Sequence, residues 1–124
     1  MKLKILKVHN HGDHQNEYVF LEVLEDCDIG EHILADSTYT SDGNLSNKVR
    51  HTFWFPDRAV KKGDRVSVRT KSGPNGISYE SAKDSHGNPL HRFYWGLEEA
   101  IWNDEGDAAI LFHIDEWRHF KVVG

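Results

Sequence analysis

Residues 17–24 carry the clearest repeating pattern in the sequence, an alternation of aliphatic residues with aromatic or charged ones. Successive side chains of an extended strand point to opposite faces, so every second residue shares a face. One face would carry Val19, Leu21 and Val23, and the other Tyr18, Phe20 and Glu22. β-Branched and aromatic residues also favour strands. The segment is therefore predicted to be a β-strand with one face in the core.

Further short apolar runs between turn signals predict the other strands. They cover residues 2–9, 32–39, 51–55, 65–70, 91–97, 108–114 and 117–123. In the first run the apolar parity switches after Ile5, which indicates a bulge or a strand buried on both sides. In residues 65–70, Val66 and Val68 alternate with polar residues, as expected of a half-buried edge or outer strand.

Turn-forming residues mark the connections between these strands. The loops are predicted at residues 41–47, 62–64, 72–76 and 84–89. The weakly apolar stretch between the last two loops is interpreted as only partly ordered. Asp115 and Glu116 are interpreted as a tight hairpin that joins the last two strands.

Helical periodicity is absent from the sequence. No window of about 12 or more residues has a period of 3.6, and residues 97–102 could form one helical turn at most. About seven to eight short strands without helices predict an all-β fold, an antiparallel β-sandwich. A chain of 124 residues needs only one core, so a single domain over residues 1–124 is expected.

Three segments, in this order, resemble the lamin-tail domain, a family with members in nuclear lamins and in many bacterial proteins. They are the strand at 17–24, the strand at 51–56 with the Lys-Gly-Asp-Arg-Val-Ser-Val run at 62–68, and residues 102–111, where Trp-Asn precedes Gly-Asp and an apolar strand. The resemblance implies an immunoglobulin-like β-sandwich of the bacterial type. The family is not known for catalysis, so the resemblance also implies an interaction module that contacts proteins, DNA or other domains.

Composition narrows the functional classes. Cys27 is the only cysteine, which excludes an intramolecular disulfide and favours a reducing, cytoplasmic location. No apolar run approaches the length of a membrane span, so no membrane partner is expected.

Cys27 lies between Asp26 and Asp28, and their negative charges should disfavour the thiolate that a Cys27–His32 nucleophile pair would need. No catalytic residue and no cofactor is predicted, because no recognised catalytic or nucleotide-binding motif is present.

Two segments have compositions that metals favour. His9, His11, Asp13 and His14 place three imidazoles and a carboxylate within six residues, ligands that suit Zn²⁺, Ni²⁺ or Cu²⁺. The alternative is a solvated loop between two strands. Residues 103–107 gather three carboxylates and an amide, but they lack the spacing of a calcium loop, so a plain turn is the favoured interpretation.

Basic residues cluster between positions 58 and 71, where Asp64 is the only acidic residue. They are Arg58, Lys61, Lys62, Arg65, Arg69 and Lys71. With an exposed Trp54 they could contact a nucleic acid through phosphates and stacked bases. The net charge of −5 opposes that interpretation. A solvated face is the favoured alternative, and head-to-tail pairing with the acidic residues of segment 22–31 is a third.

The four tryptophans are expected to pack mainly in the core. Any that are exposed together would mark the first candidate for a binding site. The leading hypothesis is a non-enzymatic interaction domain that binds a protein partner or forms a homo-oligomer, through a strand edge or an aromatic patch. Nucleic-acid binding through residues 58–71 and a metal-dependent function of residues 9–14 are the alternatives.

Overall fold

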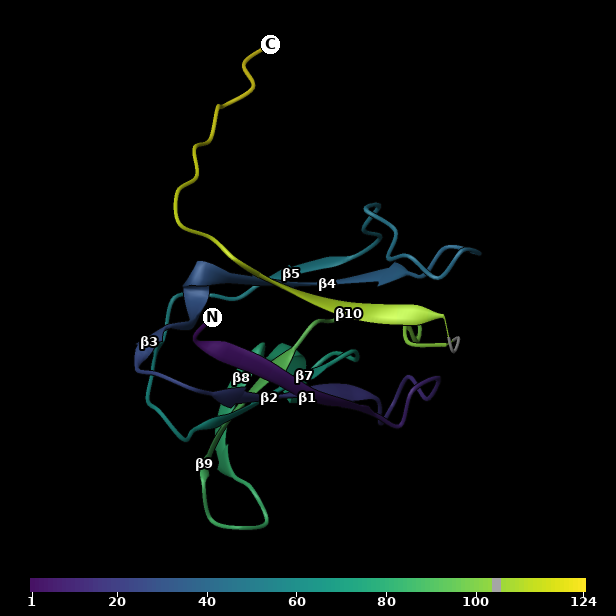
Figure 1. Cartoon of the computed structure of the whole chain (residues 1–124). Helices are drawn as coiled ribbons and strands as arrows, with labels where there is room; N and C mark the ends of the chain where they lie inside the picture. Colours follow the sequence, from purple (N-terminus) through teal and green to yellow (C-terminus); the bar gives the residue numbers. More distant parts are fainter. Residues whose placement is uncertain (104–105) are drawn as a thin grey trace.

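The strand pattern predicted from the sequence is present in the computed structural model, which describes residues 1–103 and 106–124 (Figure 1). Within these residues, helix is limited to two single 3-10 turns, Ile29–Glu31 and Pro74–Gly76. The strands are β1 (Leu3–His9), β2 (Tyr18–Val23), β3 (Cys27–Asp28), β4 (His32–Thr38), β5 (Thr52–Trp54), β6 (Ala59–Val60), β7 (Arg65–Arg69), β8 (Tyr79–Lys83), β9 (Pro89–Tyr94) and β10 (Asp107–His113). The all-β prediction is therefore confirmed.

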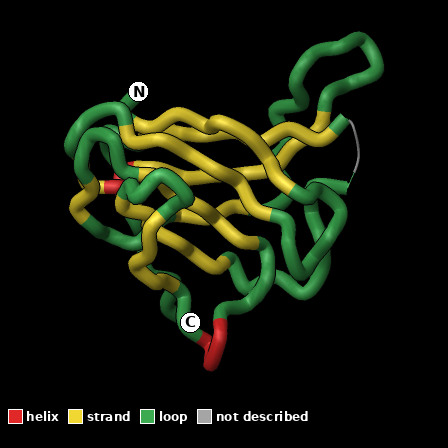
Figure 2. The backbone as a smooth tube through the Cα atoms, turned by 90° about the horizontal axis from the view of Figure 1, so that it is seen from below, coloured by secondary structure: helices red, strands yellow, loops and turns green. Residues whose placement is uncertain are grey.

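The strands form two facing layers and a short connecting ribbon (Figures 1 and 2). The first layer is a five-stranded sheet in the order β1-β2-β7-β9-β8, and the second is a three-stranded sheet in the order β10-β4-β5. β3 and β6 pair with each other. The named strand pairs are antiparallel except β7 and β9, which run parallel. The sequence could not reveal that exception, because side chains alternate in the same way in parallel and antiparallel strands.

The core lies between the two layers. Val19, Leu21 and Val23 of β2 are buried, which confirms the predicted inner face of that strand. Val66 and Val68 of β7 are buried beside them, as predicted. The opposite layer contributes Leu34, Phe53 and Leu111. Burial of such aliphatic and aromatic area is the main force that holds the layers together.

β1 contains the predicted bulge. Ile5 pairs with Leu21 and Lys7 pairs with Phe20, so Leu6 has no cross-strand partner. The extra residue resets the alternation, and Leu6 is left exposed. Leu3 and Ile5 before the bulge, and Val8 after it, all pack against the core. The switch of apolar parity in the sequence is therefore explained by the bulge.

Two predictions about the first layer are wrong. β7 is not an edge strand, because it lies between β2 and β9. Residues 79–83 are not partly ordered: they form β8, which pairs with β9 along its whole length. The loop between them is fixed by the Asp84 carboxylate, which accepts hydrogen bonds from the backbone N–H groups of His86 and Asn88. Tyr79 adds packing against the core, so one large residue anchors an otherwise polar strand.

The predicted strand at 117–123 is also wrong. The chain leaves β10 without reversing, and the last residues extend away from both layers (Figure 1). A two-residue hairpin needs left-handed backbone conformations that Gly or Asn adopt easily, and Asp115 and Glu116 provide neither. Among the described residues, no helix is long and apolar enough to cross a membrane.

Candidate functional site

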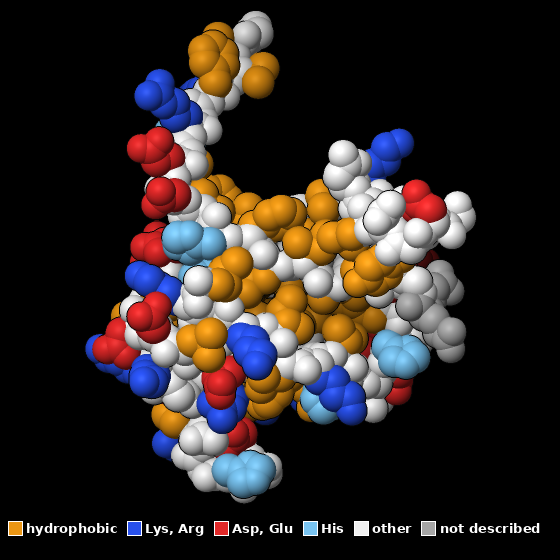
Figure 3. Space-filling view, in the orientation of Figure 1, with side chains coloured by type: hydrophobic (Ala, Val, Ile, Leu, Met, Phe, Trp, Pro, Cys, Tyr) orange, Lys and Arg blue, Asp and Glu red, His pale blue; other side chains and the backbone are white. Residues whose placement is uncertain are grey.

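The outer face of the three-stranded sheet is unusually apolar. Strand register places Phe112, Ile33 and Trp54 in one row across β10, β4 and β5. Ile110 and Ala35 form the next row. We call these five residues the outer apolar face. Figure 3 shows hydrophobic side chains gathered on the surface between the extended last segment and the loop that follows β4. Phe112 and Trp54 are exposed, Ile33 and Ile110 are partly exposed and Ala35 is buried, so much of this apolar face is accessible and is a candidate interaction surface.

A pocket of about 530 Å³ lies at one end of this face. It is formed where the 3-10 turn before β4, the chain after β5 and the chain after β10 meet. Its aromatic wall is made by Trp54 and Trp117, and its acidic groups are Glu31, Asp57 and Asp115. The described residues that line it include no lysine, arginine or histidine. The pocket is therefore both aromatic and negatively charged.

Trp54 and Trp117 are exposed together. Their rings meet edge to face, with centroids 4.9 Å apart. Trp54 is 47% exposed and Trp117 is 59% exposed, although the indole N–H of Trp54 is fixed by a 2.8 Å hydrogen bond to the Gly30 carbonyl. The other two tryptophans behave as expected, because Trp102 is buried and Trp95 packs against the core. The exposed pair meets the criterion for a binding-site candidate.

The acidic side of the pocket is built by the turn before β4. The Asp28 carboxylate accepts hydrogen bonds from the backbone N–H groups of Gly30 and Arg58, which ties this turn to the chain after β5. Gly30 packs so closely against Asp57 that a β-carbon there would lie 2.2 Å from the Asp57 carboxylate. Any larger residue at position 30 would therefore push the Asp57 carboxylate aside. The small size of Gly30 thus leaves room for Asp57 at the pocket that Glu31 also lines.

A buried histidine lies directly behind the pocket. His32 is fully buried, its ring centroid is 5.2 Å from that of His113, and its Nε2 has no hydrogen-bond partner. Burial lowers the pKa of His32 below its usual 6.5, and the nearby His113 lowers it further, while a hydrogen bond to the Ile29 carbonyl acts in the opposite direction. The folded protein therefore resists protonation at this ring.

This burial predicts a loss of stability in acid. The unfolded chain binds a proton at His32 below its ordinary pKa of 6.5 and the folded chain does not, so the free energy of unfolding should fall as the pH drops below that value. His32→Leu should flatten this part of the dependence, which urea unfolding between about pH 8 and pH 5 would measure. His86→Leu, at an exposed site, is the matched control. Equal slopes for wild type and His32→Leu would contradict the prediction.

The predicted metal residues are not brought together. The His9 ring stacks on Tyr18 at 4.7 Å, and the His14 Nε2 is 2.6 Å from the Leu97 carbonyl. Asp13 instead accepts hydrogen bonds from its neighbours Gln15 and Asn16. His11 is exposed in the same loop. In the part of the chain that the structure describes, no three His, Cys, Asp or Glu residues are arranged to hold a metal. Positions 104 and 105 of the acidic segment 103–107 lie outside the described residues.

Most of the predicted basic surface is engaged within the molecule. The Arg58 guanidinium lies 3.6 Å from the centre of the Tyr79 ring, and that of Arg69 lies 4.6 Å from the centre of the Tyr18 ring. Lys61 pairs with Asp26 at 3.7 Å and Arg65 pairs with Glu22 at 3.5 Å. Lys62 is exposed at the turn before β7.

Trp54 belongs to a different layer from Arg65 and Arg69. Trp54 lies in β5 of the three-stranded sheet, whereas both arginines lie in β7 of the five-stranded sheet. Each of these strands turns its polar or exposed side chains away from the shared core. The structure therefore does not combine Trp54 with the basic strand into one surface.

Sequence reasoning found Trp54 and missed the rest of the site. Glu31, Asp57 and Trp117 are far apart in the sequence, and only the pairing of β4 with β5 and β10 brings them together.

Burial raises the pKa of the Cys27 thiol, and nearby Glu31, Asp28 and Asp26 add to this effect against the opposing charge of Lys2. The sequence predicted that acidic neighbours would disfavour the Cys27 thiolate, and the raised pKa agrees with that prediction.

Comparison with known proteins finds no family model that matches the chain and no curated protein with significant sequence similarity.

Proposed function

We propose that this chain is a non-enzymatic interaction domain, which binds an extended protein segment at the pocket and across the outer apolar face. The observation that carries the proposal is the exposure of Trp54 and Trp117 together above three carboxylates. Exposed tryptophans in a partly enclosed site are the residues that most often dominate protein binding. The segment belongs either to a protein partner or to another copy of this chain.

The pocket defines the chemistry of its ligand. Glu31, Asp57 and Asp115 attract a positive charge, and the tryptophan rings stabilise a cation held over their faces. The adjoining row of Phe112 and Ile33 favours large apolar side chains. A segment with a lysine or arginine beside aromatic or aliphatic residues therefore complements the site. β5 is an edge strand of its sheet, so an extended backbone could also pair beside it.

We also propose that the two layers form an immunoglobulin-like sandwich of the lamin-tail type. The support is the strand at 52–54 that ends before Pro56, followed by the Gly63-Asp64 turn and the buried valines of β7. The family resemblance implies an interaction module, in agreement with the site. The free thiol of Cys27 fits a reducing compartment such as the cytoplasm.

Nucleic-acid binding is the weaker alternative. His9, Tyr18 and Arg69 stack on one another on the outer face of the five-stranded sheet, as a base-stacking surface would require. However, two arginines of the same sheet are paired with carboxylates, Arg65 with Glu22 and Arg92 with Glu80. This pairing removes positive charge that phosphate binding needs.

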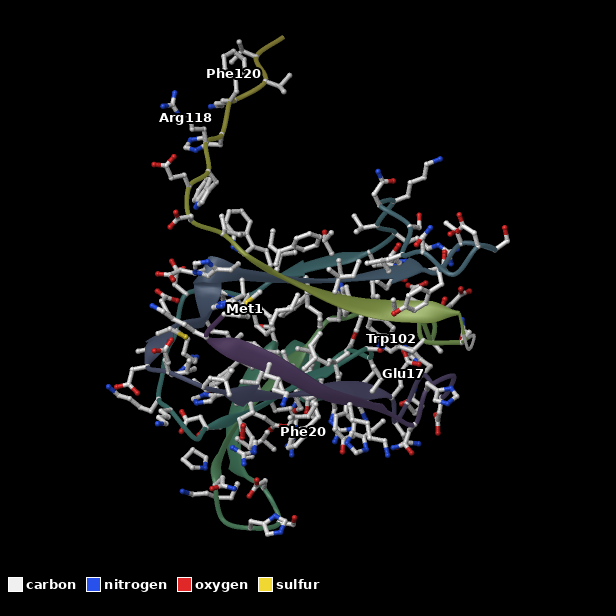
Figure 4. The ribbon with its side chains drawn as sticks, viewed as in Figure 1. Met1, Glu17, Phe20, Trp102, Arg118 and Phe120 are labelled. Carbon is white, nitrogen blue, oxygen red and sulfur yellow. The ribbon has the colours of Figure 1, made fainter. Side chains whose placement is uncertain are left out.

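Selection of random displayed peptides on the immobilised full chain tests the proposal. We expect enrichment of peptides with a basic residue beside large apolar ones. Calorimetry of a selected peptide should show at least a tenfold loss of affinity in Trp54→Ala, which is about 1.4 kcal/mol or more and approaches the scale of an interface hot spot. Phe20→Ala, which removes a half-buried aromatic ring from the other layer, is the matched control and should bind normally (Figure 4).

Two results would count against the proposal. One is the absence of any enriched peptide, and the other is equal affinity for wild type and Trp54→Ala. A short single-stranded oligonucleotide in the same assay provides the comparison with the weaker alternative. Salt-sensitive oligonucleotide binding without peptide binding would shift the assignment to the five-stranded sheet.

A further inference from the structure

The segment that follows β10 exposes large apolar side chains. We call residues 115–124 the projecting segment. The Trp117 ring contacts the Trp54 ring edge to face. The chain beyond Trp117 extends away from the two layers, as the positions of Arg118 and Phe120 show (Figure 4). Phe120 and Val122 are each 90% exposed. Large apolar residues exposed to this degree, close together, mark a surface that has a partner.

The projecting segment has the chemistry that the pocket selects. Its residues 118–123 read Arg-His-Phe-Lys-Val-Val, which alternates cations with aromatic and aliphatic side chains. The pocket offers Glu31 and Asp57 beside the outer apolar face, with no cation among its described lining residues. Charge and hydrophobicity therefore match between two parts of the same chain.

The segment is poorly placed to fill the pocket of its own chain. Trp117 already forms part of the pocket wall, and the residues after it run away from the wall. A return onto the same face would need the chain to reverse near residues 115–118, and the backbone continues there without a turn at 116–118. A second copy can receive the segment without any reversal.

We propose that two copies of this chain exchange their projecting segments reciprocally and form a two-fold symmetric dimer. Arg118 or Lys121 of each copy meets Glu31 and Asp57 of the other, and Phe120 and Val122 cover the other copy's outer apolar face. Each copy gives one segment and receives one, so the assembly closes at two chains. This inference rests on the proposed function and names the occupant of its site.

Reversing the charges of the projecting segment in one variant and of the pocket in another tests the dimer. Light scattering after size exclusion should give twice the 14.3 kDa mass of the chain for wild type. Two variants should be monomers: a segment variant, Arg118→Glu with Lys121→Glu, and a pocket variant, Glu31→Lys with Asp57→Lys. An equal mixture of the two should restore the dimeric mass, because both contacts in the mixed pair are then between opposite charges.

Two further measurements guard against misfolding and against a different interface. All of the substituted side chains are at least partly exposed, so circular dichroism should match wild type. Phe120→Ser with Val122→Ser should also give a monomer, because these two side chains form the apolar part of the contact between copies. Both are almost fully exposed within one chain, so the change should not disturb its folding. A dimer that persists in all three variants, or a mixture that stays monomeric, would overturn the exchange.

The outcome separates this inference from the proposed function. A wild-type chain that stays monomeric at low and high salt, yet binds selected peptides through Trp54, overturns the exchange and leaves the proposed function standing. A monomer whose tryptophan fluorescence changes with Phe120→Ser would show that the segment folds back on its own chain, which also overturns the exchange. A monomer that binds no peptide overturns both.

Discussion

Replacing Phe93 by alanine should lower the free energy of unfolding by about 4 kcal/mol, within the range for large-to-small changes in a core. Phe93 is completely buried in β9. Its ring centroid lies 5.2 Å from that of Phe55, 6.0 Å from that of Phe53 and 5.1 Å from that of Tyr79. These partners come from both layers, so one ring joins the two sheets. Its removal leaves a cavity that neither sheet can fill without moving the other.

Urea unfolding followed by tryptophan fluorescence would measure this cost. Phe93→Leu should lose less, because most of the buried volume remains. Phe120→Ala makes the same chemical change on the projecting segment, where the side chain is 90% exposed, and should change the free energy of unfolding of the monomer by about 0.5 kcal/mol or less. A loss below about 1 kcal/mol for Phe93→Ala would contradict the central place of this ring.

The contrast between these two phenylalanines shows what the sequence could predict. β2 and β7 were predictable because alternation over five or more residues indicates both the strand and its buried face, as Val66 and Val68 confirm. The bulge in β1 was predictable for the same reason, since it shifts the alternation. Phe120 lies in an equally apolar stretch, yet it is exposed. Local pattern shows that a segment could form a strand, but it does not show that a neighbouring strand is available to pair with it.

Long-range pairing explains the other errors. β8 contains Glu80, Ser81 and Lys83, which are poor strand formers, and it is ordered by its ladder with β9. The central place of β7 depends on the parallel partner β9, more than twenty residues later in the chain. The exposure of Trp54 was predictable from its position between two core phenylalanines. Its carboxylate neighbours were not, because they depend on how three strands pair.

Replacing Glu17 by alanine should also lower the free energy of unfolding by about 4 kcal/mol, because at least two buried donors lose their acceptor at about 1–3 kcal/mol each. Glu17 is completely buried. Its Oε2 accepts hydrogen bonds from the Thr70 hydroxyl at 2.5 Å and from the Ile101 backbone N–H at 2.9 Å, and its Oε1 accepts one from the Gly12 backbone N–H at 3.0 Å. One carboxylate thus ties three loops together.

Glu17→Gln should lose less than Glu17→Ala, because it keeps the shape and one acceptor oxygen. Glu25→Ala, at an exposed site, should stay within about 0.5 kcal/mol of wild type. A change for Glu17→Ala as small as that of Glu25→Ala would contradict the role of this hydrogen-bond network.

The place of Glu17 in the molecule makes this variant informative about function as well. Glu17 lies near Trp102, away from the end that carries the projecting segment (Figure 4). Sites with no shared partners usually contribute independently to the free energy. Glu17→Ala should therefore lower stability while leaving peptide affinity and dimer mass unchanged at temperatures where it is folded. Trp54→Ala should do the opposite, because Trp54 is half exposed and contributes little to the core. If both variants lost stability and binding in proportion, the apparent site would be an indirect effect of folding.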